Sequence, residues 1–328
     1  MGGRLDPAVA RTRVAVRECL ADLEPGDLVL VACSGGADSL ALLAACCFEG
    51  GKAGLSVGAV VVDHRLQDGS LEVAVHAAKV AAALGAEPVR VERVAVGRQG
   101  GPEGAARAAR HAALQRVSDH LGAKALLLAH TRDDQAETVL LGLARGSGTR
   151  SLAGMRPVIG RVRRPLLGIT HDETVRACRA EGIEWWEDPH NADPAHARAR
   201  VRHTVLPVLE DQLGPGVRDA LARTSDLLRV DADALDALAD LLFHQAADSW
   251  GLRVDLLLSA PAALRHRALR TAAVGAGCPA GEVTAGHVLA LDALLTDWHG
   301  QRGVDLPGRV RAERVAGALR LSASGVTG

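Results

Sequence analysis

Short, continuously apolar runs alternate with longer segments of helical periodicity through the first half of the chain. The apolar runs predict strands, and the longer segments predict helices. The expected strands are residues 28–33, 57–64, 88–94 and 123–130, and the expected helices are 38–49, 70–85, 103–122 and 132–144. Apolar strands separated by helices are typical of a parallel sheet covered on both faces. The pattern therefore predicts an α/β fold with a Rossmann-like parallel sheet and helices on both faces.

The alternation stops near residue 145. Residues 145–167 are rich in glycine and arginine and predict loops around one short strand. A capping box that begins at Thr170 predicts a helix that ends near residue 182. After the Gly-Pro-Gly turn at 214–216, apolar residues again recur at helical spacing. We therefore expect an α/β domain followed by a smaller, mainly helical domain, with ranges 1–214 and 215–328.

Polar residues follow three of the predicted strands. The first strand runs into residues 34–39, the second ends in Asp63 and His64, and the fourth ends in His130. In open parallel sheets, ligands bind beyond the carboxyl ends of the strands. The sequence therefore predicts one ligand site at this edge of the sheet.

The first polar segment is Ser-Gly-Gly-Ala-Asp-Ser. Adjacent glycines let the backbone turn tightly and present N–H groups to an anion, and the next helix points its N-terminus at the same place. Asp38 would repel a phosphate unless a Mg²⁺ ion lay between them. The segment matches neither GxxxxGK[ST] nor GxGxxG. It predicts a polyphosphate and magnesium site, against the alternative of an ordinary strand–helix turn. Its residues are Ser34, Gly35, Gly36, Ala37, Asp38 and Ser39.

A histidine and three carboxylates follow the fourth predicted strand. Asp133 and Glu137 are four residues apart and share a helix face, and His130 stands at the strand end. Such a group suits metal binding and proton transfer. The alternative is that Asp133 and Asp134 only complement the helix dipole.

Two further segments are ambiguous by themselves. Arg107 and Arg110 lie on one face of a predicted helix, which taken alone indicates a solvated surface. Trp185 and Trp186 precede an acidic turn, and they either pack in the core or stack on a nucleic-acid base.

The net charge of −1 does not indicate a nucleic-acid-binding protein, but the charges are segregated along the chain. No carboxylate occurs between Glu137 and Asp172, where six arginines fall, and a second basic cluster occupies residues 196–203. Segregated charge can form a local anion-binding face on a neutral protein. The alternative is a solvated arginine surface.

The six cysteines are scattered without a CxxC pair. This spacing indicates reduced thiols rather than a disulfide framework or a metal cluster. Residues 1–19 are broken by charges and lack the apolar core of a signal peptide. No apolar stretch approaches the roughly 18 residues of a membrane span. We therefore expect a cytoplasmic protein without membrane contact.

Together these segments resemble the tRNA(Ile)-lysidine synthetases, a branch of the PP-loop ATP pyrophosphatases. The matching segments occur in the family's order and cover most of residues 28–210. They are SGGADS at 34–39, VDHRLQDGS at 62–70, EGAARAARH at 103–111, the block at 130–155, RRPLL at 163–167 and EDPHNADPAHARARVRH at 187–203. The chain departs from the family at Ala199, where Asn is usual, and at Arg65, where a second His is frequent. Both departures concern tRNA contact more than the chemistry.

The resemblance implies a reaction on an isoleucine tRNA with a CAU anticodon. ATP would adenylate the C2 carbonyl oxygen of the wobble cytidine and release pyrophosphate. The ε-amine of free L-lysine would then attack C2 and displace AMP, and the resulting lysidine would pair with A instead of G. The implied cofactors are ATP and Mg²⁺, and the implied partners are tRNA(Ile) and L-lysine. A homodimer is left open by the sequence.

The resemblance also implies roles for individual residues. It implies catalytic roles for Asp38, Asp133, Asp134, His130, Arg107 and Arg110, ATP binding by residues 34–39, Asp63 and His64, and Mg²⁺ binding by Asp38 and Asp134. It implies contacts with the tRNA backbone from the smaller domain and from Arg145, Arg150, Arg163, Arg164, Arg198, Arg200, Arg202 and His203.

Two alternatives belong to other functional classes. A tRNA thiolase of the same superfamily would also adenylate a base, but the cytidine-thiolating enzymes favour SGGKDS and need CxxC pairs, whereas this chain has Ala37 and no CxxC. A non-catalytic nucleotide-binding module with the same sheet would need neither the acidic cluster at 130–137 nor two arginine-rich segments.

Overall fold

The computed structural model describes residues 5–63, 65, 69–94, 101–146, 148–188 and 193–323, with the backbone alone at 101–103. It divides into two compact units, and the boundary lies between Asp226 and Leu227. This boundary falls within the long helix α10 (Val217–Ala246). The sequence-based boundary at residue 214 lies ahead of that helix.

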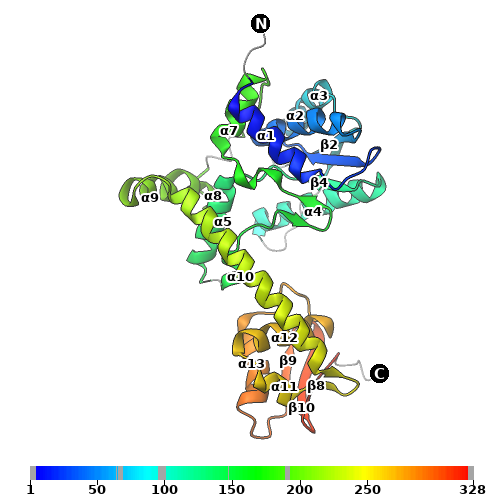
Figure 1. Ribbon diagram of the computed structural model, residues 1–328, viewed down its shortest axis with the longest axis vertical. Helices are drawn as coiled ribbons and strands as arrows, with labels where there is room; N and C mark the ends of the chain where they lie inside the picture. Colours follow the sequence, from blue (N-terminus) through cyan, green and yellow to red (C-terminus); the bar gives the residue numbers. More distant parts are fainter. Residues whose placement is uncertain are drawn as a thin grey trace. The chain divides into compact units, whose positions relative to one another are not determined.

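The larger unit is built on a six-stranded sheet with the order β3-β2-β1-β4-β6-β5 (Figure 1). Its strands are β1 (Leu28–Ala32), β2 (Ser56–Asp63), β3 (Val89–Arg93), β4 (Ala125–Leu127), β5 (Val158–Ile159) and β6 (Val162–Arg163). All neighbours pair in parallel except β5 and β6, which form an antiparallel hairpin. The chain builds outward from β1 to β3 and then returns to the other side of β1 with β4. The strand order therefore reverses between β1 and β4, which is where such sheets bind ligands.

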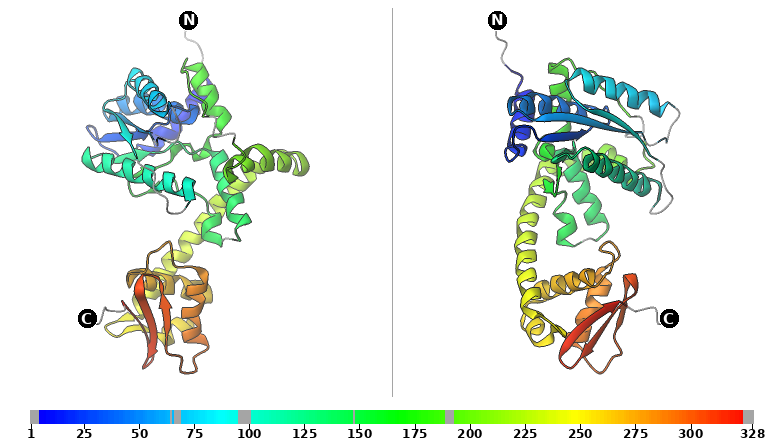
Figure 2. Two further views of the ribbon diagram at one scale, coloured as in Figure 1. Left: turned by 180° about the vertical axis from the view of Figure 1, so that it is seen from behind. Right: turned by 90° about the vertical axis from the view of Figure 1, so that its right-hand side faces the viewer.

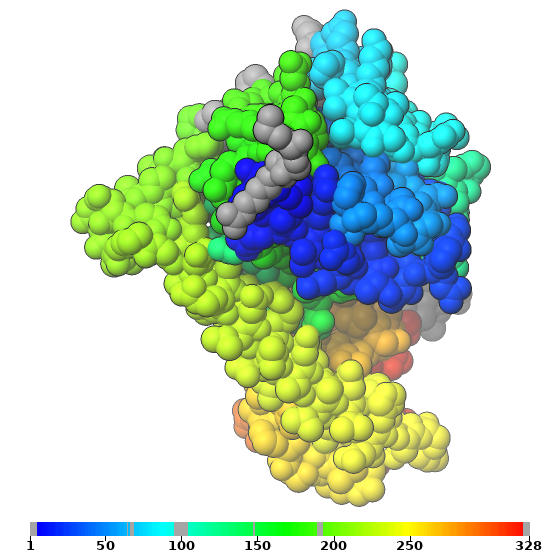
Figure 3. Space-filling model, turned by 45° about the horizontal axis from the view of Figure 1, so that its top comes forward, coloured from blue at the N-terminus to red at the C-terminus, as the bar shows by residue number. Residues whose placement is uncertain are grey.

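Helices cover both faces of this sheet (Figure 2). One face packs against α1 (Pro7–Cys19), α2 (Ala37–Lys52), α3 (Ser70–Ala83) and α7 (His171–Ala180), and the other packs against α4 (Gly101–His120). The remaining helical segments of this unit are α5 (Arg132–Ala144), α6 (Thr149–Leu152), η1 (Pro165–Gly168), α8 (Ala197–Arg200), η3 (Val201–Val205) and α9 (Leu206–Leu213). On the face shown in Figure 3, α1 borders both α2 and α7.

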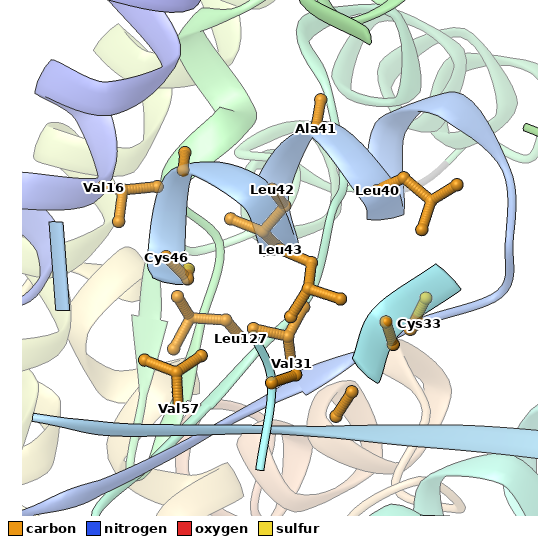
Figure 4. Packing of buried hydrophobic residues seen from close by; sticks show 14 of the residues in the cluster. Val16, Val31, Cys33, Leu40, Ala41, Leu42, Leu43, Cys46, Val57 and Leu127 are labelled. Atoms are coloured by element: carbon orange, nitrogen blue, oxygen red, sulfur yellow. The ribbon is translucent and has the colours of Figure 1, made fainter. Parts of the chain in front are cut away.

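The main core lies between α2 and the sheet. Leu43 and Cys46 of α2 point toward Val31, Val57 and Leu127 of the strands (Figure 4). All five side chains are at most 7% exposed. Burying side chains of this kind contributes about 1.5–3 kcal/mol for each large aliphatic residue, so this layer fixes α2, and with it the loop that precedes α2.

The predicted α/β fold is confirmed, and each of the four predicted strands is present. The single short strand expected within 145–167 is instead the β5–β6 hairpin. Gly160, with φ of 56°, supplies the left-handed conformation of its turn. Among the described residues, no helix is long and apolar enough to cross a membrane.

The smaller unit contains the predicted helices together with a sheet that the sequence analysis does not predict. Its helices after α10 are α11 (Val254–Ser259), α12 (Ala262–Gly275) and α13 (Ala285–Thr296). Its antiparallel strands, in the order β7-β8-β11-β10-β9, are β7 (Ala247–Asp248), β8 (Gly251–Arg253), β9 (Val304–Leu306), β10 (Val310–Val315) and β11 (Ala318–Ala323). Leu269, Leu291 and Leu319 meet in a separate core.

Candidate active site

The loop of residues 34–39 joins β1 to α2 and is held by its own hydroxyl groups. The Ser39 hydroxyl accepts from the Ser34 backbone N–H at 3.2 Å and donates to the Gly36 carbonyl at 2.9 Å. Gly35 takes a φ of 84°, which is a left-handed conformation. Because α2 begins at Ala37, its unpaired first-turn N–H groups lie at this loop. The local geometry is that of a phosphate-binding turn.

Asp38 lies in the first turn of α2 and contacts the first turn of α7. Its Oδ1 accepts from the buried Thr174 hydroxyl and lies 2.9 Å from Nδ1 of His171. The hydrogen bond to Asp38 raises the pKa of His171, although burial opposes this shift. The backbone N–H of His171 donates in turn to Asp133 Oδ2 at 2.8 Å. One turn of α7 thus brings the carboxylates of α2 and α5 together.

His171 and Thr174 are site residues that the sequence does not predict. The capping box predicted at Thr170 is present in the structure. That signal places both residues on the first turn of a helix. It carries no information about the carboxylates that this turn meets.

Asp134 and Glu137 form a buried ion cluster with two arginines. Arg202 bridges both carboxylates, at 3.1 Å from Asp134 Oδ1 and 2.5 Å from Glu137 Oε1. Arg198 lies 3.4 Å from the other Glu137 oxygen. Burial raises the pKa of the fully buried Glu137 despite these arginines. The pKa of Asp134 is lowered because Arg202 and the helix cap at Thr131 outweigh its burial.

Asp134 also caps α5. Its Oδ2 accepts from the backbone N–H of Thr131 at 2.8 Å and from the Thr131 hydroxyl at 3.0 Å. Both carboxylate oxygens of Asp134 therefore have protein partners. The helix-terminal interpretation holds for Asp134, whereas Asp133 binds the N-terminus of α7 instead.

His130 lies beyond the end of β4 among cationic groups. Its Nδ1 accepts from Arg164 Nε at 3.3 Å. The pKa of His130 is lowered to about 4, chiefly by burial and also by Arg164, Arg110 and Arg107, although Asp134 opposes the shift. Burial also lowers the pKa of Arg110, with Arg107 adding to the effect. The arrangement favours an anion at this position.

Two cavities adjoin the 34–39 loop. The larger, of about 1110 Å³, joins the loop to the predicted catalytic residues. Its lining includes Ser34, Asp38, Arg107, Arg110, His130, Asp133, Asp134, His171, Trp186, Arg198, Arg202 and His203. The smaller, of about 320 Å³, lies between the ends of β1 and β2 and is lined by Asp63, Arg65, Arg110 and Trp186 among others. The predicted convergence of strand ends is thus present, although His64 lies outside the described residues.

The two tryptophans have different surroundings. Trp185 packs against the main core, as the structural interpretation expects. Trp186 donates its backbone N–H to the Gly35 carbonyl at 3.0 Å and lines both cavities. Trp185 also lines the larger cavity, but of the two tryptophans Trp186 alone borders both cavities and contacts the 34–39 loop through its backbone.

The eight predicted tRNA-contacting residues fall into distinct groups. Arg163 is 8% exposed and pairs with Asp22 at 2.5 Å, and Arg164 is equally buried beside His130. Arg198 and Arg202 belong to the ion cluster around Glu137. The surroundings of Arg163 give no support to a tRNA contact. Three of the other four predicted residues are exposed on the larger unit, namely Arg145, Arg150 and Arg200. The fourth, His203, lines the large cavity.

Two protein families match this chain, and each match falls within one of the two units. Residues 10–209 match the PP-loop domain family, and residues 252–320 match the TilS substrate binding domain. A tRNA(Ile)-lysidine synthase from Thermobifida fusca is 54% identical over 97% of this chain and 98% of its own. Another from Leifsonia xyli is 55% identical over 90% of each chain. The chain belongs to the tRNA(Ile)-lysidine synthase family. The resemblance drawn from the motifs is thereby confirmed.

A further relative is the tRNA(Ile)-lysidine synthase of Streptomyces coelicolor. It is 48% identical over 95% of this chain and 97% of its own. Among solved structures, the U34-tRNA thiolase NcsA from Methanococcus maripaludis has a similar fold, with a TM-score of 0.54 and 20% identity over 68% of this chain and 80% of its own. The PP-loop family implies that this chain uses ATP.

Proposed function

We propose that this chain ligates free L-lysine to C2 of the wobble cytidine in the CAU anticodon of tRNA(Ile). The C2 oxygen attacks the α-phosphorus of ATP and pyrophosphate leaves. The lysine ε-amine then forms a bond to C2, the C2–O bond breaks, and AMP departs. The observation that carries the proposal is the large cavity, which joins the 34–39 loop to carboxylates and arginines in a member of this family. The product would read AUA instead of AUG.

ATP is proposed to occupy both cavities. The 34–39 loop and the N-terminus of α2 would hold its phosphates, and the smaller cavity would hold the nucleoside. Asp63 is buried there and accepts from the backbone N–H of Arg65 at 3.0 Å. That contact and Arg93 lower the pKa of Asp63 although its burial raises it, so it can accept from a ribose hydroxyl. The predicted role of His64 remains a proposal.

Mg²⁺ is proposed to bind Asp38 together with the phosphates. Within the described part of the chain, no three His, Cys, Asp or Glu side chains form a metal site, but Mg²⁺ commonly uses one carboxylate plus phosphate oxygens. Among the residues that the structure describes, both contacts of the Asp38 carboxylate use Oδ1, which leaves Oδ2 for a cation. The ion would neutralise charge on the departing pyrophosphate. Asp134 fits this role less well because its oxygens are engaged.

Lysine and tRNA are proposed to enter the same cavity. Asp133 would orient the ammonium group of lysine, and Arg107 and Arg110 would steady the phosphates. Arg145, Arg150, Arg200 and His203 would contact the tRNA backbone, together with the residues that match the substrate binding domain. A cytoplasmic location and a homodimer are further proposals.

The thiolase alternative finds no support in the cysteines. All six are free, and four of them are buried. None belongs to a CxxC pair, and a cluster-dependent sulfur transfer needs such ligands.

Incorporation of radiolabelled lysine into unmodified tRNA(Ile) transcript with a CAU anticodon tests the proposal. We expect label that depends on ATP and Mg²⁺, with AMP and pyrophosphate formed in equal amounts. A methionine tRNA with the same anticodon serves as the control and should remain unlabelled. ATP cleavage stimulated by tRNA without incorporation of lysine would show that the nucleophile is not lysine.

A Gly35→Ala variant tests the phosphate-binding turn. An added Cβ would lie 3.0 Å from the Cβ of Ala77 on α3, and a left-handed φ costs a residue with a side chain about 1–2 kcal/mol. We expect ATP affinity, measured by calorimetry, to fall about tenfold or more. Gly51→Ala lies near the end of α2, the helix that follows this loop, and its added Cβ would meet open space. It is the matched control and should bind ATP normally. Equal affinities for both variants would contradict the assigned turn.

A further inference from the structure

The Arg164–His130 hydrogen bond determines which nitrogen of the imidazole carries a proton. Arg164 donates through Nε to His130 Nδ1. A guanidinium has donors only, so Nδ1 must be the acceptor in this pair. A neutral imidazole has one N–H, and its proton therefore sits on Nε2. Since His130 lines the large cavity, Nε2 is the nitrogen left for a ligand.

Arg164 is itself fixed by the neighbouring backbone. Its Nη1 donates to the Arg156 carbonyl at 2.9 Å, and its side chain is buried. The segment that carries this carbonyl is pinned by Gln135 of α5. The Gln135 amide donates to the Met155 carbonyl at 3.0 Å and accepts from the Met155 N–H at 2.7 Å. Two hydrogen bonds thus secure the backbone that orients Arg164.

We propose that Arg164 is a positioning residue that holds His130 as the Nε2–H tautomer, so that His130 donates a hydrogen bond into the cavity and accepts no proton there. The inference rests on the proposed function, in which the acceptor is an oxygen of the adenylated cytidine or its phosphate. Arg110 lines the same cavity and favours an anionic oxygen. The low pKa of His130 agrees with a neutral ring at physiological pH. The proton of the lysine amine must then pass to another group, such as a carboxylate of the cavity.

Two amide substitutions of His130 separate a donor from a base. A glutamine side chain can place an N–H near the position of Nε2, whereas asparagine places its amide near Nδ1. We expect lysidine formation to fall about 10²-fold in His130→Ala and His130→Asn, the usual loss on removing one preorganised donor. His130→Gln should retain at least about tenfold more kcat than His130→Asn. Equal losses in the Gln and Asn variants would overturn the proposal. His120→Gln, at the exposed end of α4, is the control.

Nitrogen NMR of the full chain labelled with ¹⁵N-histidine tests the tautomer without any substrate. The His130 signals are those lost in His130→Gln. In the unmodified protein we expect a protonated Nε2 and an unprotonated Nδ1, and in Arg164→Met we expect signals averaged between tautomers. Arg116→Met, exposed on α4, should leave them unchanged. A protonated Nδ1 in the unmodified protein, or an unaltered tautomer in Arg164→Met, would overturn the proposal. Because this readout involves no lysine, it stands or falls separately from the proposed function.

Discussion

Lysine incorporation by an Asp38→Asn variant is expected to be lower by about 10³-fold or more. The amide keeps the oxygen that accepts from Thr174, so α2 and α7 stay joined, but it removes the negative charge proposed to hold Mg²⁺. Electrostatic stabilisation of a departing phosphate commonly contributes several kcal/mol to catalysis. Formation of AMP and pyrophosphate should fall together with lysine incorporation, since adenylation comes first. Binding of tRNA, measured by filter retention, should be unaffected.

Two further variants show whether charge or anchoring is responsible. Thr174→Val removes the hydroxyl that contacts Asp38 and the His171 carbonyl but leaves the charge of Asp38 in place. We expect its activity to fall by less than about tenfold, as for the loss of a neutral hydrogen bond. Asp240→Asn, on the exposed surface of α10, controls for loss of a carboxylate elsewhere. If Thr174→Val were as inactive as Asp38→Asn, Asp38 would serve chiefly to anchor α7, and the magnesium role would be wrong.

An Arg202→Met variant is expected to lose about 3–5 kcal/mol of unfolding free energy. Arg202 is the closest cation to the fully buried Glu137, and removing one partner of a buried ion pair leaves an uncompensated charge. At about 2–4 °C per kcal/mol for a unit of this size, thermal unfolding followed by circular dichroism should shift downward by roughly 10 °C. The double variant Arg202→Met with Glu137→Gln should recover much of this loss, because the buried charge is gone.

Arg200→Met is the matched control for this prediction. Arg200 is exposed and donates to the carbonyls of Pro194 and Ala195. The unfolding free energy of the Arg200→Met variant should therefore differ from that of the unmodified protein by no more than about 0.5 kcal/mol. If Arg202→Met unfolded normally but bound tRNA weakly, the sequence-based role of Arg202 as a phosphate contact would be correct and the structural role would be wrong.

The sequence predicts the sheet and the loop because both depend on local signals. The apolar runs of β1 to β4 are contiguous in the chain, and Gly35-Gly36 marks a turn wherever it occurs after a strand. The parallel arrangement then dictates that Asp38, Asp63 and His130 share one edge. Family resemblance added the substrate and the reaction to this edge.

What the sequence could not predict depends on distant partners. Arg202 and Glu137 are 65 positions apart, and Arg163 and Asp22 are 141 positions apart. No periodicity relates these residues, so an arginine that neutralises a buried carboxylate looks the same in the sequence as one that faces RNA. The sheet of the smaller unit was missed for another reason. Its strands are short and carry arginines, as β10 does at Arg311 and Arg314, which obscures the alternation of strands.

The internal pairing of Arg163, Arg198 and Arg202 has a consequence for how salt affects tRNA affinity. Binding of a polyanion by free cations releases condensed counterions, and each phosphate neutralised makes affinity fall more steeply with salt concentration. Guanidinium groups already neutralised by Asp22, Asp134 and Glu137 contribute little to this release. The affinity of this chain for tRNA should therefore vary less steeply with ionic strength than its two arginine-rich segments suggest, and shape and stacking would carry a correspondingly larger share of recognition.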